Sequence, residues 1–185
     1  MIAVFINNKL ISVDNIAPLM MEMKAEQADL NIQFFCLDYA TFTGIKQNVV
    51  LWDAINSFSS LCPLGSPNRS KLGRLLHKFY MIPLLSKLLF LAISSQLTAV
   101  HFGLLNHWPL RLLWLVNRKQ TVFVQSAPFG HSKTETAVDN IARLRKAPPE
   151  IPAASSVICF EKDWDYVASL DVPKLVLSPT VALPS

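Results

Sequence analysis

The sequence predicts an α/β fold: a doubly wound, mostly parallel, Rossmann-like sheet with helices on both faces. Short apolar runs that lack polar alternation, such as Ile2-Ala3-Val4-Phe5-Ile6, are typical of strands buried on both sides. Segments of helical periodicity separate these runs, which is typical of βαβ units. With 185 residues, 51% of them apolar, the chain can form a substantial core, and this composition excludes an intrinsically disordered protein.

The opening segment is expected to form one βαβ unit with a right-handed crossover. Asp14 or Asn15 can cap its helix, and Pro18 is tolerated in a first helical turn. The expected strands of the whole chain are residues 2–6, 31–37, 49–52, 98–102, 121–125, 157–160 and 174–177. The expected helices are residues 16–30, a helix from residue 70 onward, and residues 108–117, 134–146 and 162–170.

Punctuating residues set the expected boundaries. Residues 56–70 are rich in Ser, Pro and Asn and are expected to form a loop that ends at a capping Asn68 or Ser70. Pro83 is expected to kink or end the helix that follows. We expect one Rossmann-like domain over residues 1–178, followed by residues 179–185.

The charge of the chain is unevenly placed. The formal net charge is +4, yet no Asp or Glu occurs between Asp53 and Glu135, a stretch that carries nine Lys and Arg residues. Such asymmetry indicates an anionic partner: a nucleic acid, an anionic lipid surface or a phosphorylated ligand. Nucleic acid is the weakest of the three, because few aromatic residues lie among the basic ones. A solvated basic face without a partner is the alternative.

The helix after Ser70 combines an apolar and a basic side. Leu72, Leu75, Leu76 and Phe79 recur at helical spacing, and further Leu and Phe residues follow Pro83. Such a helix can lie in the interface of an anionic membrane, or its apolar stripe can simply cover the sheet. The residues expected to face the membrane are Lys71, Arg74, Lys78 and Lys87. A transmembrane span over residues 79–100 is disfavoured by Pro83, Lys87 and the polar residues 94–96.

Cysteines and motifs exclude several classes of site. Cys36, Cys62 and Cys159 are isolated and lack metal-ligand spacing, so neither a disulfide framework nor a metal site is expected, and Cys36 and Cys159 are expected to be buried. There is no GxGxxG, P-loop, HExxH or GxSxG motif, so no cofactor is expected. The residues instead favour a cytoplasmic protein, peripheral at the inner face of the membrane.

Ligands of parallel α/β sheets bind outside the carboxyl ends of the strands. His101 and His131 follow or end two expected strands there, and either imidazole could act as a general base or contact phosphate. Structural histidines are the alternative for both. The residues expected to contact a ligand at the same edge are Asn7, Asn8, Lys9, Gly103, Ser126 and Gly130.

This organisation resembles the N-terminal half of a GT-B glycosyltransferase. The resemblance rests on the strand–helix–strand of residues 2–38, on the strand ends at residues 99–103 and 121–131, and on the late strand–helix–strand of residues 156–177 running into Ser178-Pro179. It departs from the family in having Asn7-Asn8-Lys9 where several members have a Gly-rich loop. It also departs in lacking the donor domain after residue 178.

The resemblance implies that residues 1–178 form an acceptor-binding domain and that residues 179–185 are a linker toward a second domain. The acceptor of the sugar transfer would be a cell-surface polysaccharide or a lipid-linked glycan, and the six ligand-contacting residues named above would bind it. The sugar would come from a nucleotide sugar held by a separate domain or subunit, without a metal in general. By itself the chain would then be inactive. The alternative function is a non-catalytic α/β module that docks on anionic membrane through its basic amphipathic helix.

Overall fold

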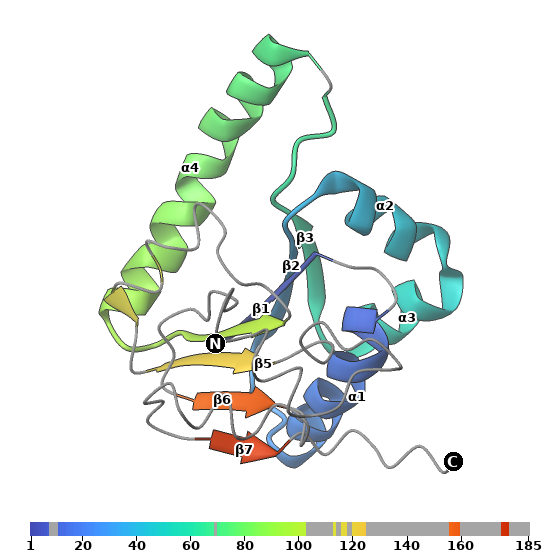
Figure 1. Ribbon diagram of the computed structural model, residues 1–185, viewed down its shortest axis with the longest axis vertical. Helices are drawn as coiled ribbons and strands as arrows, with labels where there is room; N and C mark the ends of the chain where they lie inside the picture. Colours follow the sequence, from blue (N-terminus) through green and yellow to red (C-terminus); the bar gives the residue numbers. More distant parts are fainter. Residues whose placement is uncertain are drawn as a thin grey trace, which may run out of the picture.

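The computed structural model describes residues 1–7, 11–68, 70–102, 113, 116–117, 120–124, 156–159 and 175–177. Its centre is one parallel sheet with helices packed against it (Figure 1). The strands are β1 (Ile2–Ile6), β2 (Ile32–Cys36), β3 (Ser60–Pro63), β4 (Thr98–Phe102), β5 (Thr121–Val124), β6 (Ser156–Cys159) and β7 (Leu175–Leu177). The helices whose bounds lie among the described residues are α1 (Ile11–Glu26), α2 (Tyr39–Gln47), α3 (Val49–Phe58) and α4 (Lys71–Ile93).

The seven strands lie in the order β3-β2-β1-β4-β5-β6-β7, and each neighbouring pair is parallel. The predicted parallel α/β sheet is therefore confirmed. The strand order changes direction beside β1, whose two neighbours are β2 and β4. The carboxyl ends of β1 and β4 thus meet where chain segments diverge to opposite halves of the sheet, the usual place for a ligand in such folds.

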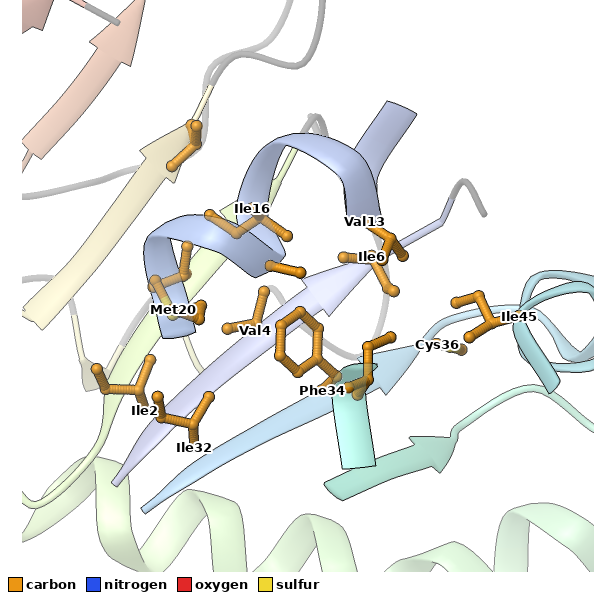
Figure 2. Packing of buried hydrophobic residues seen from close by; sticks show 14 residues of the cluster. Ile2, Val4, Ile6, Val13, Ile16, Met20, Ile32, Phe34, Cys36 and Ile45 are labelled. Carbon is orange, nitrogen blue, oxygen red and sulfur yellow. The ribbon is translucent and has the colours of Figure 1, made fainter. Parts of the chain in front are cut away.

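Side chains of β1 alternate between two cores, one on each face of the sheet. Val4 and Ile6 belong to the first core, in which Val13, Ile16 and Met20 of α1 pack over the sheet (Figure 2). Ala3 and Phe5 point to the opposite face and pack with Leu88 and Ala92 of α4. Helices therefore cover both faces, which explains why β1 carries no polar residue.

The segment expected as the third strand is helical, and the third strand lies in the expected loop. Residues 49–52 begin α3, because the Asn48 side chain caps this helix by accepting a hydrogen bond from the Leu51 backbone N–H at 3.3 Å. Val49 and Val50 are 68% and 76% exposed, so this β-branched run does not enter the core. The actual strand, β3, ends at Pro63 and lies at the edge of the sheet, where proline is tolerated.

The boundaries of the other strands agree closely with expectation where the structure describes them. β4 spans the predicted residues, and β1, β2, β5, β6 and β7 lie within two residues of their predicted bounds. Helix α1 was expected over residues 16–30, but it begins and ends earlier, so the prediction that Asp14 or Asn15 caps it is wrong and Pro18 lies inside the helix rather than in its first turn. The helices expected at residues 134–146 and 162–170, most of that expected at 108–117, and the linker 179–185 lie outside the described residues.

Helix α4 begins as predicted, and it does not end at Pro83, which was one of the two effects expected of this proline. The Ser70 hydroxyl oxygen caps it by accepting a hydrogen bond from the Gly73 backbone N–H at 3.0 Å. The helix continues through Pro83 to Ile93. Pro83 is exposed, so the backbone carbonyl group that loses its N–H donor can be solvated, and the helix tolerates the proline.

Candidate functional site

Helix α4 is much longer than the strands it packs against. Its 23 residues extend about 35 Å, whereas a five-residue strand extends about 17 Å. The buried residues of α4 are Met81, Leu88 and Ala92, none of which belongs to its first ten residues. The N-terminal part of α4 consequently projects beyond the carboxyl edge of the sheet, as Figure 1 shows.

The side of α4 that points away from the sheet is apolar, the reverse of the pattern expected for a surface helix in water. Seven large apolar side chains on this side are each between 50% and 69% exposed. They are Leu72, Leu75, Leu76, Phe79, Ile82, Phe90 and Ile93, which together are called the outward face below. A row of exposed apolar side chains along one helix marks a surface that contacts an apolar partner or phase.

Cationic residues flank the outward face on both sides. At 3.6 residues per turn, Arg74 and Lys78 fall between the outward face and the core-facing Met81, while Lys87 falls on the opposite flank. Lys71, Arg74, Lys78 and Lys87 are all exposed. Because no acidic residue occurs between Asp53 and Glu135, no carboxylate of α4 offsets these charges.

Helix α4 is also the one helix among the described residues that is long and apolar enough to cross a membrane. That finding is one of length and composition, and the core helix of a soluble protein can share both features. In this fold Leu88 and Ala92 pack against Ala3 and Phe5 of β1. The contacts therefore hold the second half of α4 on the sheet, while its outward face stays uncovered by the described residues.

A cleft of about 470 Å³ lies between α4 and the segments that follow β2 and β3. We call it the α4 cleft. Leu37 after β2, Leu64 after β3, and Met81, Leu85 and Leu89 of α4 make its walls mainly apolar. Its volume is in the range usual for small-molecule sites.

The charged residues that line the α4 cleft are cationic. Arg74 and Lys78 line it, and no Asp or Glu lies among its described lining residues. The His77 Nε2 atom is 3.1 Å from the Leu64 backbone carbonyl oxygen, so a hydrogen bond ties α4 to the segment after β3. Asp38 lies nearby in the chain, but its carboxylate accepts hydrogen bonds from the backbone N–H and the hydroxyl of Thr41, both at 2.7 Å.

Gly65 holds the loop after β3 close to the start of α2. A β-carbon at this position would lie 2.5 Å from the Tyr39 backbone nitrogen and 2.6 Å from the Asp38 α-carbon. Only glycine fits such an approach of backbone to backbone. Gly65 also lines the α4 cleft, so its lack of a side chain helps to set the position of one wall.

The structure places His101 inside the protein rather than at the edge of the sheet. Its side chain is 0% exposed, and its ring stacks on that of Phe5 in the neighbouring strand. Burial lowers the pKa of His101 from 6.5 to about 3, so the imidazole is neutral at pH 7. The position at the end of the fourth strand was predicted correctly, whereas the expected exposure to a ligand was wrong.

The remaining predicted site residues are described only in part. Asn7 is exposed at the carboxyl end of β1, and its backbone carbonyl oxygen accepts a hydrogen bond from the Thr41 hydroxyl at 3.0 Å. Neither Asn7 nor His101 is among the described residues that line the α4 cleft. The other predicted residues lie outside the described ones: Asn8, Lys9, Gly103, Ser126, Gly130 and His131.

The cysteines behave as predicted where the structure describes them. Cys36 and Cys159 are buried, and burial is the largest cause that raises the pKa of the Cys36 thiol to about 12. Burial also raises the pKa of the half-buried Cys62. Both thiols are thus protonated and unreactive at pH 7. Among the described residues, no cluster of His, Cys, Asp and Glu could hold a metal ion.

Comparison of the chain with protein-family models, with curated proteins and with solved structures gives no match. The class that the fold defines is therefore a parallel α/β domain, identified by its topology. Its distinguishing feature is the projecting helix α4, with an apolar outward face, a cationic flank and a cleft beneath it.

Proposed function

We propose that this chain is the acceptor-binding half of a GT-B glycosyltransferase, docked on the cytoplasmic face of an anionic membrane. In this proposal the sheet is the doubly wound, Rossmann-like N-terminal domain of such an enzyme. The acceptor would be a lipid-linked glycan or a growing cell-surface polysaccharide. A nucleotide-sugar-binding domain or partner subunit would supply the donor.

The observation that carries the proposal is the outward face of α4 beside the carboxyl edge of the sheet. Seven exposed apolar side chains and four exposed cations on one projecting helix suit the interface of an anionic membrane. Each Lys or Arg near such a surface contributes about 1 kcal/mol to binding. Because ligands of parallel sheets bind at the carboxyl edge, docking through α4 would bring that edge close to a membrane-bound acceptor.

The reversal of the strand order beside β1 adds support, since such a point is the usual site of ligand binding in doubly wound sheets. Asn7 lies at this point, and Asn8, Lys9, Gly103, Ser126 and Gly130 are proposed to bind the acceptor with it. His131 remains the proposed general base or phosphate contact. His101 is no longer assigned that role, because it is fully buried and neutral.

Sugar transfer in membranes of the source organism tests the proposal. Membranes from a strain that lacks this chain should no longer incorporate sugar from a nucleotide sugar into one lipid-soluble or polysaccharide product, and the purified chain should restore it. A chain with Leu76→Asn and Phe79→Asn should fail to restore it, whereas Val50→Asn on α3 should succeed. Unchanged sugar incorporation in the deletion strain would contradict the proposal.

The second candidate is a non-catalytic module that docks on anionic membrane through Lys71, Arg74, Lys78 and Lys87. The same outward face supports it. The two candidates differ in one result: the module would sediment with anionic vesicles at low salt while its deletion left every sugar-transfer product unchanged.

A further inference from the structure

We propose that the α4 cleft is a binding site for the apolar chain of a singly phosphorylated amphiphile, whose phosphate is held by Arg74 and Lys78. This inference rests on the proposed function, because it names the part of a lipid-linked acceptor that this domain would grip. It assigns the ligand to residues that are separate from the strand ends beside β1.

The walls of the cleft select an apolar ligand. Leu37 and Leu64 on one side oppose Leu85 and Leu89 of α4 on the other. Water in a space with such walls finds few hydrogen-bond partners, so an apolar chain displaces it favourably. At about 470 Å³ the cleft accepts one chain-like ligand segment and is far larger than a packing defect.

The charge of the cleft selects an anionic head group. Arg74 presents a planar guanidinium that can donate two hydrogen bonds to phosphate, and Lys78 adds a second positive charge one helical turn away. No Asp or Glu lies among the described residues that line the cleft, and the carboxylate of Asp38, next to Leu37 in the chain, accepts hydrogen bonds from Thr41. A phosphate at this rim therefore contacts two cations, and none of the described lining residues carries a carboxylate that would repel it.

The position of the two cations joins the cleft to the membrane surface. Arg74 and Lys78 lie on α4 between the outward face and the core-facing side, and both line the cleft. Ile82 of the outward face also lines the cleft, so the cleft opens directly beside the outward face. A lipid leaving a bilayer on which the outward face rests would reach the cleft across these cations. A second copy of this chain is a poorer occupant, because it would bring its own cations against them.

The wall of the cleft that follows β3 is held in place independently of any ligand. The hydrogen bond from His77 to the Leu64 carbonyl oxygen fixes α4 against the segment after β3. The close approach of Gly65 to Asp38 and Tyr39 fixes that segment against α2. The site is thus largely formed before binding, as is usual for small-molecule sites.

Calorimetric titration of the chain with dodecyl phosphate, below its micelle-forming concentration, tests the site. Saturable binding of one dodecyl phosphate per chain is expected, with much weaker binding of dodecyl maltoside and of inorganic phosphate. Lys78→Gln or Arg74→Gln should weaken binding by about tenfold, the effect of losing a charge-assisted hydrogen bond. Lys87→Gln is the matched control, since Lys87 does not line the cleft, and it should leave the affinity within about twofold.

A cleft-filling variant separates this inference from the proposed function. Ser86 lines the cleft and is exposed, so Ser86→Trp should abolish dodecyl phosphate binding while the circular dichroism spectrum and vesicle binding persist. Phe90→Trp, on the outward face, adds the same side chain outside the cleft and should bind dodecyl phosphate normally. Conversely, Leu76→Asn with Phe79→Asn should lose vesicle binding and keep dodecyl phosphate binding.

Three results would overturn the inference. The first is no binding of dodecyl phosphate, and the second is equal affinity of wild type and Ser86→Trp. The third is equal affinity for dodecyl phosphate and dodecyl maltoside, which would remove the role of Arg74 and Lys78. Each of these leaves membrane docking through the outward face intact, so the two proposals fail separately.

Discussion

The rings of Phe5 and His101 stack on one another with centroids 5.3 Å apart and an angle of 11° between their planes. The two residues are register partners in β1 and β4, at the centre of the sheet. Stacking on Phe5 and full burial make this histidine part of the protein interior rather than a group that a ligand can reach. An imidazole in this place has a consequence for how stability depends on pH.

We expect acid to destabilise the protein through His101. Its folded-state pKa, about 3, lies below the ordinary value of 6.5, so only the unfolded chain binds this proton between these values. Stability is therefore fully present above about pH 6.5 and falls as the pH decreases toward 3, by up to about 4 kcal/mol from this group. Urea unfolding at pH 7.5, 6, 5 and 4 measures this loss of folding free energy.

The control for the pH dependence is His101→Phe, which keeps an aromatic ring against Phe5 and removes the titrating group. The carboxyl groups titrate alike in both proteins, so the difference between the two pH slopes reports His101. A wild type and a variant with the same slope between pH 6.5 and 4 would contradict the burial of a neutral imidazole.

Gly65→Ala should destabilise the protein by about 1–3 kcal/mol, because the added methyl group would lie within 2.6 Å of the Asp38 and Tyr39 backbones. The midpoint of urea unfolding checks this, with Ser66→Ala as the neighbouring control. A midpoint for Gly65→Ala equal to that of wild type would show that the loop after β3 does not lie against α2.

Ser70→Ala should cost about 1 kcal/mol through loss of the cap that accepts from the Gly73 N–H. The loss should be concentrated in the projecting first turns of α4, which have few packing contacts to hold them. Hydrogen exchange of residues 71–80 is the measurement. Ser57→Ala in α3, whose hydroxyl donates to the Ala54 carbonyl oxygen, is the control and should leave those amides unchanged. Equal protection of residues 71–80 in Ser70→Ala and wild type would count against the cap.

Replacing the outward face by polar residues should spare stability. Leu76 and Phe79 are 60% and 61% exposed, so Leu76→Asn with Phe79→Asn should change the free energy of unfolding by no more than about 0.5 kcal/mol per site. Leu88→Asn, in the core-facing row, should instead cost several kcal/mol, on the order expected for an unpaired buried amide and a lost apolar side chain. Similar losses for the two rows would mean that the outward face is packed.

The sequence predicts the sheet well because its signal is local. Apolar runs such as residues 2–6 and 98–102 need burial on both faces and can hardly be anything other than central strands. The exchange of strand and helix around residues 49–63 shows the limit of that signal. The run Val49-Val50-Leu51-Trp52 has strand-like composition, but it forms the start of a helix. The Asn48 side chain caps this helix, and Ile55 buries it against the core.

The outward face and the α4 cleft were harder to predict from the sequence, for a different reason. The stripe of Leu72, Leu75, Leu76 and Phe79 is compatible with a helix that covers a sheet and with a helix whose apolar side faces outward. The structure distinguishes the two because α4 is longer than the strands, so its first turns extend past the sheet and leave this stripe exposed. The α4 cleft joins Leu37, Leu64 and Leu85, which are far apart in the chain, so no local pattern predicts it. The absence of acids around Arg74 and Lys78 was the one visible signal.

Depth-dependent fluorescence quenching tests the central claim, that the outward face of α4 enters an anionic membrane, most directly. Phe79→Trp and, as a control, Val50→Trp on the exposed start of α3 would be mixed with anionic vesicles that contain brominated lipids. After subtraction of the wild-type signal, the tryptophan at position 79 should be quenched by bromines near the head groups, and that at position 50 should not. Absence of quenching at position 79, or equal quenching at both positions, would contradict the claim.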